Sequence, residues 1–277
     1  MAQADQAVDA AERPQDGTGA LGRPRAAPVP FRDGIDIEYG PRALLAAYFL
    51  AAEAHLQAHG LTLTFEPLET LVAINEANRD TWIPLLPLFN PAYGMDRAHG
   101  FCLIARNAAG AVRATQAGRF FPWTSTSFKR EAQSLRLFYA DPVRQAKPGE
   151  ACRVTVPGSD SLGGRVVFSG GVWCHPEVRG TGLTGILPRI SRAHALSRWS
   201  TDVTMTFFAE AVAKGGVAKR AGYSDVGYDV AFENNHLAGV RVGLATMRTE
   251  QLIEDLSGAL EAFDLPEVDP VLHRRAG

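Results

Sequence analysis

The stretch HPEVRGTGLTGILPRI, residues 175–190, decides how this chain is interpreted. It places Gly180, Gly182 and Gly185 in the spacing G-x-G-x-x-G, which is typical of turns that bind a dinucleotide pyrophosphate. The same letters from Arg179 onward also fit a loop that wraps the pyrophosphate of coenzyme A. Glycines at such a turn let successive backbone amides face one anion, at the positive end of the following helix. The sequence therefore predicts a pyrophosphate-binding loop and leaves two cofactors to compare.

The composition indicates an ordinary globular protein. A chain of 277 residues can form one large domain or two small ones. It has 28 Lys and Arg residues against 30 Asp and Glu residues, so the formal net charge is −2. This balance argues against nucleic acid as the principal ligand, and no polybasic run favours an anionic membrane. We therefore expect neither a nucleic-acid partner nor a membrane partner.

The three cysteines, Cys102, Cys152 and Cys174, are an odd number with no C-x-x-C pair. Such usage favours buried, reduced thiols and a cytoplasmic location. Cys174 and His175 are adjacent, and neighbours on a strand point to opposite faces, so we expect no metal site. The longest apolar stretch, residues 43–52, is too short to span a bilayer.

Hydrophobic periodicity divides the chain into a tail and a folded region. Residues 1–30 lack aromatic side chains and are expected to be a disordered tail. Residues 31–60 are expected to be an N-terminal helical extension, and 61–277 a domain with an insertion at about 122–164. Strands are predicted at 61–66, 101–106, 111–121, 165–176, 203–210, 226–232 and 239–247. Helices are predicted at 41–59, 68–79, 128–140, 183–199, within 211–227 and at 249–263, with a packed loop at 81–94.

The dinucleotide interpretation has one point in its favour and two against it. It expects an acid at the end of the next strand, and Glu210 lies at such a place. However, six residues, 174–179, separate the apolar strand from Gly180, where a dinucleotide fold has almost none. The strands before the loop also follow hairpin order rather than strand–helix alternation. An NAD(P)-dependent oxidoreductase is therefore kept as an alternative.

The residues VWCHPEVRGTGL, 172–183, resemble the principal acetyl-CoA motif of the GNAT-type N-acetyltransferase superfamily, V-x-P-x-x-R-G-x-G-[IL]. VAKRAGYSDVG, 217–227, is similar to that family's later motif, a short helix ending in Gly-Phe or Gly-Tyr before a strand. The resemblance covers roughly residues 61–247. It implies a mixed α/β (α+β) fold, with a largely antiparallel central sheet that is splayed at the cofactor strand and flanked by helices.

The resemblance also implies a reaction and a binding site. An acetyl group would pass from acetyl-CoA to a small-molecule or peptide amine by direct attack, without a covalent enzyme intermediate. Loop residues would hold the pyrophosphate, and the strand before them would pair with the pantetheine arm. The cofactor-binding residues implied are Val172, Trp173, Cys174, Arg179, Gly180, Thr181, Gly182, Leu183 and Thr184.

Two side chains are candidates for the chemical steps. Acyl transfer to an amine needs a base for the ammonium and an acid for the departing thiolate. Glu210 is the candidate base, although a carboxylate at a helix start is also an ordinary cap. Tyr223 is the candidate acid if its hydroxyl reaches the sulfur, although an aromatic there is also an ordinary core residue. The family often has a tyrosine four residues before Gly-Phe, and Ala218 stands there in this chain.

Other features leave alternatives open. The 122–164 insertion is expected to form part of the acceptor pocket, and Pro188 should kink the helix after the loop. The missing tyrosine keeps a non-catalytic acyl-CoA-binding or sensing module as an alternative. A homodimer is compatible with the sequence. The acceptor is not specified: a small amine, an amino acid, a peptide N-terminus and an aminoglycoside all remain open.

Overall fold

The computed structural model describes residues 27–94, 96–223, 226–240 and 242–263. Most of the predicted N-terminal tail lies outside this part of the chain. Within it, Val29 and Pro30 form strand β1, which pairs antiparallel with β2 (Leu61–Glu66). Phe31 is buried and packs on Phe49 and Phe65, so it holds this segment against the edge of β2. The prediction of a disordered tail reaching residue 30 is therefore wrong for its last residues.

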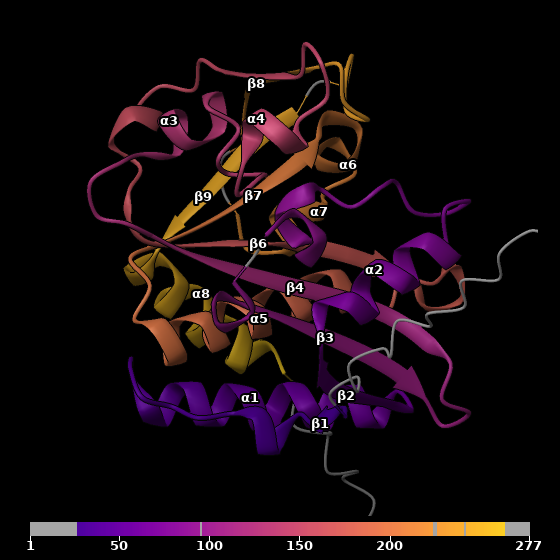
Figure 1. The fold of residues 1–277 in the computed structure, drawn as a ribbon. Helices are drawn as coiled ribbons and strands as arrows, with labels where there is room; N and C mark the ends of the chain where they lie inside the picture. The colour runs from indigo at the N-terminus through magenta and orange to yellow at the C-terminus, as the bar shows by residue number, and fades with distance from the viewer. Residues whose placement is uncertain (1–26, 95, 224–225, 241, 264–277) are drawn as a thin grey trace, which may run out of the picture.

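A nine-stranded sheet in the order β1-β2-β3-β4-β6-β7-β9-β8-β5 forms the centre of the described structure (Figure 1). Only β6 and β7 pair in parallel; the other neighbours are antiparallel. The predicted largely antiparallel mixed sheet is thus confirmed. The strands not yet given bounds are β3 (Gly100–Asn107), β4 (Val112–Trp123), β5 (Ala151–Val154), β6 (Gly164–Cys174), β7 (Val203–Ala209), β8 (Val226–Glu233) and β9 (Val242–Arg248).

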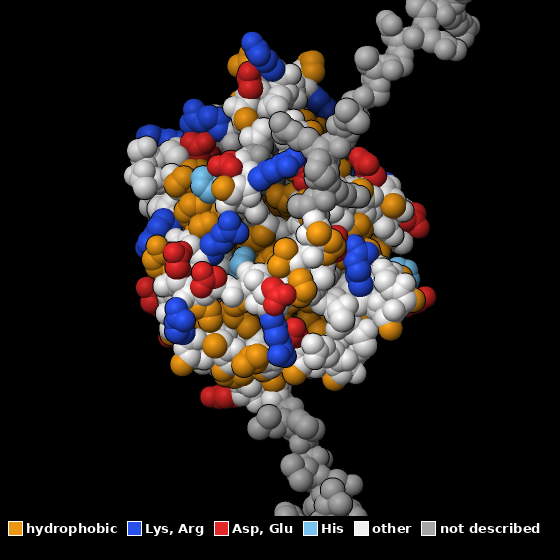
Figure 2. All heavy atoms as spheres, turned by 60° about the horizontal axis from the view of Figure 1, so that its bottom comes forward, with side chains coloured by type: hydrophobic (Ala, Val, Ile, Leu, Met, Phe, Trp, Pro, Cys, Tyr) orange, Lys and Arg blue, Asp and Glu red, His pale blue; other side chains and the backbone are white. Residues whose placement is uncertain are grey.

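Helices cover both faces of the sheet and enclose two apolar cores. One face carries α1 (Arg42–Ala58), α5 (Leu183–Trp199) and α8 (Thr249–Ala262), which pack against one another, with α1 lowest in Figure 1. The residues expected to form a helical extension thus pack in the same layer as the helix after the glycine loop. On the face that carries α1, acidic and basic side chains are interspersed (Figure 2).

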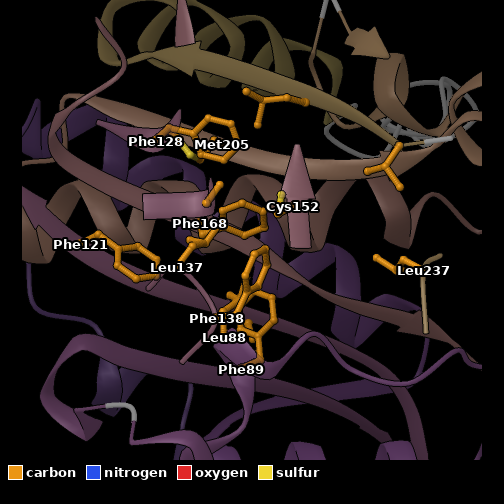
Figure 3. Close-up of a cluster of buried hydrophobic side chains, with 14 of the residues drawn as sticks. Leu88, Phe89, Phe121, Phe128, Leu137, Phe138, Cys152, Phe168, Met205 and Leu237 are labelled. Carbon is orange, nitrogen blue, oxygen red and sulfur yellow. The ribbon is translucent and has the colours of Figure 1, made fainter. Parts of the chain in front are cut away.

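The opposite face carries α2 (Leu68–Ala77), the segment 81–93 and the insertion, which contains α3 (Phe128–Gln133), α4 (Pro142–Gln145) and β5. The insertion adds β5 to the sheet edge beside β8. Its aromatic side chains Phe128 and Phe138 are buried in the core of this face (Figure 3). The helix predicted over 128–140 stops at Gln133, since Leu135 has a positive φ of 61°.

The sheet opens where β6 leaves β7. These strands pair at only three positions, the last being Phe168 with Met205. Beyond it, β6 stays with β4 as far as Cys174, while β7 stays with β9 as far as Ala209. The two strand ends therefore diverge, and backbone edges that face each other lack a strand partner.

A β-bulge marks the same place on β6, which contains the pair Gly170–Gly171. Gly171 and Val172 together lie opposite the single residue Gln116 of β4. Gly171 has a φ of +62°, and its carbonyl accepts a hydrogen bond from Thr115 Oγ1 at 2.8 Å. Extra backbone on β6 bends the strand away from β7, so the bulge and the opening are one feature.

The segment after β7 forms two short helices where the sequence predicted one. Helix α6 (Glu210–Lys214) and helix α7 (Val217–Arg220) are separated by Gly215 and Gly216, of which Gly216 has a φ of +77°. The three cysteines are free and buried, as predicted. The described residues hold no cluster of three potential metal ligands, and none of their helices is both long and apolar enough to cross a membrane.

Candidate functional site

A pocket of about 900 Å³ occupies the opening between β6 and β7. One end is formed by the glycine loop, the start of α5 and helix α7. The other end is formed by residues 81–86 and Phe89, on the opposite face of the sheet. The pocket therefore passes through the sheet and is accessible to both helical layers.

At the first two positions of the motif, glycine is required by the backbone conformation and not by the closeness of neighbouring atoms. Gly180 and Gly182 have φ values of +86° and +83°, where L side chains are strained. A Cβ built on either glycine would meet no atom within 4 Å, so open space lies in front of the loop. Gly185 differs, because its Cβ would lie 2.9 Å from the carbonyl oxygen of Arg220. The third glycine of the motif thus serves the close packing of α5 on α7.

Five consecutive amides of this loop are free. The backbone N–H groups of residues 180–184 donate to no acceptor atom in the described part of the chain. Gly182, the N-cap of the 17-residue helix α5, has no side chain to cap them. Unpaired amides at the positive end of a long helix form an anion site. The loop therefore fits a pyrophosphate, as both cofactor hypotheses required.

Two arginines line the pocket near these amides. Arg179 is exposed, and its Nε donates to the carbonyl of Cys174 at 3.3 Å. Arg220, at the end of α7, was not singled out from the sequence, although it lies inside the second motif. Arginine is well suited to bind phosphate oxygens. Both cations lie on the side of the pocket that carries the free amides.

A buried charge cluster holds α7 in place. Asp255 of α8 accepts hydrogen bonds from Arg189 and Arg192 of α5, at 2.8 and 3.2 Å. The same arginines donate to the carbonyls of Arg220 and Ala221 at 2.7 and 2.6 Å. These bonds satisfy the carbonyls at the end of α7 and tie three helices together. They also fix the backbone that carries Arg220 toward the pocket.

Tyr223, the predicted acid, lines the pocket and is 3% exposed. Its hydroxyl makes no hydrogen bond of ordinary geometry to the described residues. Burial raises the pKa of Tyr223, against the lowering effect of the Arg192 guanidinium, which lies 4.9 Å from the ring centre. The phenol is therefore protonated near neutral pH. The hydroxyl is itself buried, so it is not exposed to the pocket, and the role of Tyr223 as an acid stays a prediction.

Glu210, the predicted base, does not line the pocket, although its neighbours Ala209 and Val212 do. It is the first residue of α6, and its carboxylate pairs with Lys214 at 3.0 Å. This geometry matches the ordinary alternative of a carboxylate at a helix start. Among the described residues that line the pocket there is no Asp, Glu, His or Lys. The role of Glu210 as a base stays a prediction.

Of the cofactor residues implied by the motif, only Thr181 does not line the pocket. Its Oγ1 donates to the carbonyl of Val178 at 2.7 Å and closes the turn, so any contact with phosphate involves its amide. Cys174 lines the pocket, and burial raises the pKa of its thiol to about 11. A thiol that is protonated at neutral pH is a poor nucleophile, which agrees with direct transfer.

Pro188 obtains a structural explanation that the sequence alone did not supply. It lies inside α5, is buried and lines the pocket. Proline has no amide hydrogen, so the carbonyl of Thr184 loses its helical partner one turn earlier. Pro188 therefore contributes a rigid apolar wall just behind the loop.

The insertion, which was predicted to form part of the acceptor pocket, does not line this pocket. None of the residues 122–164 lines the pocket, because their apolar side chains are buried in the core and β5 lies at the far edge of the sheet. The segment from Thr81 to Phe89 takes that place. Thr81 Oγ1 accepts a hydrogen bond from Trp173 Nε1 at 3.2 Å, and Trp82 stacks on Trp173 with ring centres 5.8 Å apart.

Comparison with known proteins yields no match to a family model and none to a curated sequence. Solved structures with a similar arrangement include mutant forms of the spermidine/spermine N-acetyltransferase SpeG from Vibrio cholerae, at 9% identity and a TM-score of 0.43 over 71% of this chain and 98% of that one. NAA60 from Arabidopsis thaliana in complex with acetyl-CoA matches at 11% identity and a TM-score of 0.41, over 68% and 99%. YncA from Salmonella typhimurium with its cofactor acetyl-CoA matches at 14% identity and a TM-score of 0.36, over 68% and 94%.

Proposed function

We propose that this protein is an acetyl-CoA-dependent N-acetyltransferase of the GNAT type. The observation that carries the proposal is the row of free amides at 180–184, which opens directly onto the gap between β6 and β7. An anion site alone would suit many phosphate ligands. Next to an unpaired strand edge, it suits a cofactor that continues from a pyrophosphate into an arm able to hydrogen-bond like a strand.

Each part of the site then has a task. The amides of the loop and the guanidinium groups of Arg179 and Arg220 bind the phosphates. The free edge of β6 after Phe168 orients the pantetheine arm. The backbone N–H of Val172 or Trp173, next to the bulge, stabilises the oxyanion of the reacting carbonyl.

Proton transfer would use side chains next to these cofactor-binding groups. Tyr223 is the candidate acid, and it can protonate the departing thiolate only if its buried hydroxyl reaches the sulfur. Glu210 reaches an ammonium acceptor only if its ion pair with Lys214 opens. Ala218 is buried in α7 and has no hydroxyl, so it cannot replace the acid that the family often carries there.

The alternatives fit less well. A dinucleotide-binding oxidoreductase requires a parallel, doubly wound sheet, and this sheet is parallel at one pair of strands only. Glu210, the acid expected to bind the ribose, pairs with Lys214 instead. A sensing module that binds acyl-CoA without turning it over shares the whole binding site. It is distinguished from the enzyme by kinetics and not by shape.

Calorimetric titration with acetyl-CoA and, separately, with NADH tests the cofactor. We expect saturable binding of acetyl-CoA and none of NADH; the reverse result would contradict the proposal. Release of free coenzyme A thiol over a broad panel of amines then tests turnover. If acetyl-CoA binds and no amine accelerates thiol release, the sensing module replaces the enzyme.

A further inference from the structure

The two ends of the pocket differ sharply in chemistry. Both cations that line it, Arg179 and Arg220, lie at the end with the glycine loop. The other end has mostly apolar side chains, with the hydroxyl of Thr81, and no ionisable group among the described lining residues. We name this end the distal chamber; its principal walls are Trp82, Leu86, Phe89, Phe168, Trp173 and Phe207.

The walls of the distal chamber are held rigidly. The rings of Phe168 and Phe207, from β6 and β7, meet edge to face with centres 4.9 Å apart. Phe89 lies so close to Gly170 that a Cβ there would approach its ring to 2.8 Å. Figure 3 shows Phe89 and Phe168 in the same buried cluster. The chamber is thus a preformed aromatic cavity, which favours binding of a flat apolar group.

The polypeptide segment that closes the chamber is fixed by one buried amide. Asn75, on α2, is 3% exposed. Its Nδ2 donates to the carbonyl of Ile83 at 2.8 Å, and its Oδ1 accepts from the amide of Leu85 at 3.1 Å. The segment therefore keeps its shape without help from a ligand.

Two large apolar side chains are exposed at the rim of the pocket. Ile83 and Val212 both line the pocket, and they are 62% and 45% exposed. Large apolar side chains exposed at the edge of a concave site are typical of binding surfaces for apolar ligands. A polycation would meet no carboxylate among the described lining residues, either at this rim or in the chamber.

We infer that the acceptor is an uncharged aromatic amine whose ring occupies the distal chamber. The inference rests on the proposed function and narrows it to a substrate class. A charged ammonium would lose hydration in the chamber, and no carboxylate among the described lining residues would neutralise its charge. An aromatic amine is unprotonated at neutral pH and presents a ring to Trp82 and Trp173.

This acceptor also removes the need for a base that the site does not provide. The amine nitrogen forms a bond to the thioester carbonyl carbon as the carbon–sulfur bond breaks. The proton that the nitrogen loses balances the proton that the departing thiolate gains. No net proton is taken up by the protein, so Glu210 need not enter the pocket.

The isomers p-toluidine and benzylamine test the inference, because they contain the same atoms and differ in basicity. The neutral fraction of a basic amine falls about tenfold for each pH unit below its pKa. With acetyl-CoA at pH 7, we expect kcat/KM for p-toluidine to exceed that for benzylamine and spermidine by about tenfold or more. We also expect the p-toluidine rate to change little from pH 6.5 to 8.5, while the benzylamine rate rises.

A matched pair of variants tests whether the acceptor contacts the rim of the pocket. Ile83→Ser should raise KM for p-toluidine several-fold, whereas Val143→Ser, at a residue 95% exposed and outside the pocket, should not. Faster turnover of benzylamine or spermidine at pH 7 would overturn the inference. So would a rate that rises with acyl chain length from acetyl-CoA to octanoyl-CoA, because the chamber would then hold the acyl chain.

Tryptophan fluorescence separates this inference from the proposed function. Trp82 and Trp173 stand in the chamber, so p-toluidine should quench emission, and Trp82→Phe should weaken the quenching. If acetyl-CoA binds and p-toluidine neither quenches nor reacts, the acceptor class is wrong and the cofactor proposal stands. If p-toluidine quenches while acetyl-CoA does not bind, the proposed function fails and the chamber remains an aromatic binding site.

Discussion

At the scale of the residue, two glycines of the loop are required for different physical reasons. Gly182 adopts a left-handed conformation with open space in front of it, whereas Gly185 is required by the nearby carbonyl of Arg220. From the sequence the two look alike, as members of one G-x-G-x-x-G pattern. Spacing shows that the chain turns tightly, but the neighbour that excludes a side chain comes from another part of the chain.

Gly182→Ala tests the role of the loop against a matched control. Gly110, in the β3–β4 turn, has a φ of +78° and likewise no atom within 4 Å of a built Cβ. Each alanine should cost about 1 kcal/mol of unfolding free energy through backbone strain. Only Gly182→Ala should weaken binding of acetyl-CoA, measured by calorimetry, because its Cβ enters the proposed phosphate site. Equal loss of binding in both variants would contradict this assignment.

At the scale of the element, the position of α7 depends on charges carried by other helices. Arg192 of α5 is fully buried, and its partner Asp255 belongs to α8. Gly222, just after α7, has a φ of +89° and leaves no room for a Cβ beside the Asp255 carboxylate. The motif around Gly222 was recognisable from the sequence. Its link to Asp255 was not, because α8 lies outside the region that resembles the family.

Asp255→Asn should therefore destabilise the protein strongly. It leaves Arg192 buried without its counter-charge, which typically costs about 3–5 kcal/mol. The control Asp160→Asn removes an exposed partner of Lys129 and should cost less than about 1 kcal/mol. Urea unfolding of both variants measures the difference. Similar midpoints for the two variants would show that the cluster contributes little.

The insertion shows where element-scale prediction failed. It was predicted to form part of the acceptor pocket, but its aromatic side chains form the core of one sheet face. Strand and helix periods identify which side chains are buried, and they do not say whether the buried space is filled or hollow. The short proline-rich segment 81–94, predicted only as a packed loop, proved to form the pocket wall over Thr81–Phe89.

At the scale of the whole molecule, one buried histidine couples stability to pH. His194 of α5 lies between the rings of Phe65 and Phe101, at 4.6 and 4.7 Å between ring centres. Burial, reinforced by the charge of Arg198, lowers the pKa of His194 to about 3. The unfolded chain binds this proton below about pH 6.5, so the stability contribution is complete above that pH and is lost as the pH falls toward 3.

The contribution of His194 should amount to about 1.4 kcal/mol of unfolding free energy for each pH unit within this window. His194→Leu should therefore lose less stability than the unaltered protein between pH 7.5 and pH 5, measured by urea unfolding. His99→Leu, at a partly exposed histidine outside this core, should keep the original pH dependence. An unchanged slope in His194→Leu would show that other groups dominate.

The sequence by itself determined the elements and the position of the glycine loop. Most strands and the long helices lie close to their predicted bounds, because side-chain periodicity and glycine placement are local properties of the chain. Only the tertiary structure decided what lies opposite the loop. The divergence of β6 from β7, the entry of Arg220, the pairing of Glu210 with Lys214 and the aromatic chamber all depend on packing between segments distant in the sequence.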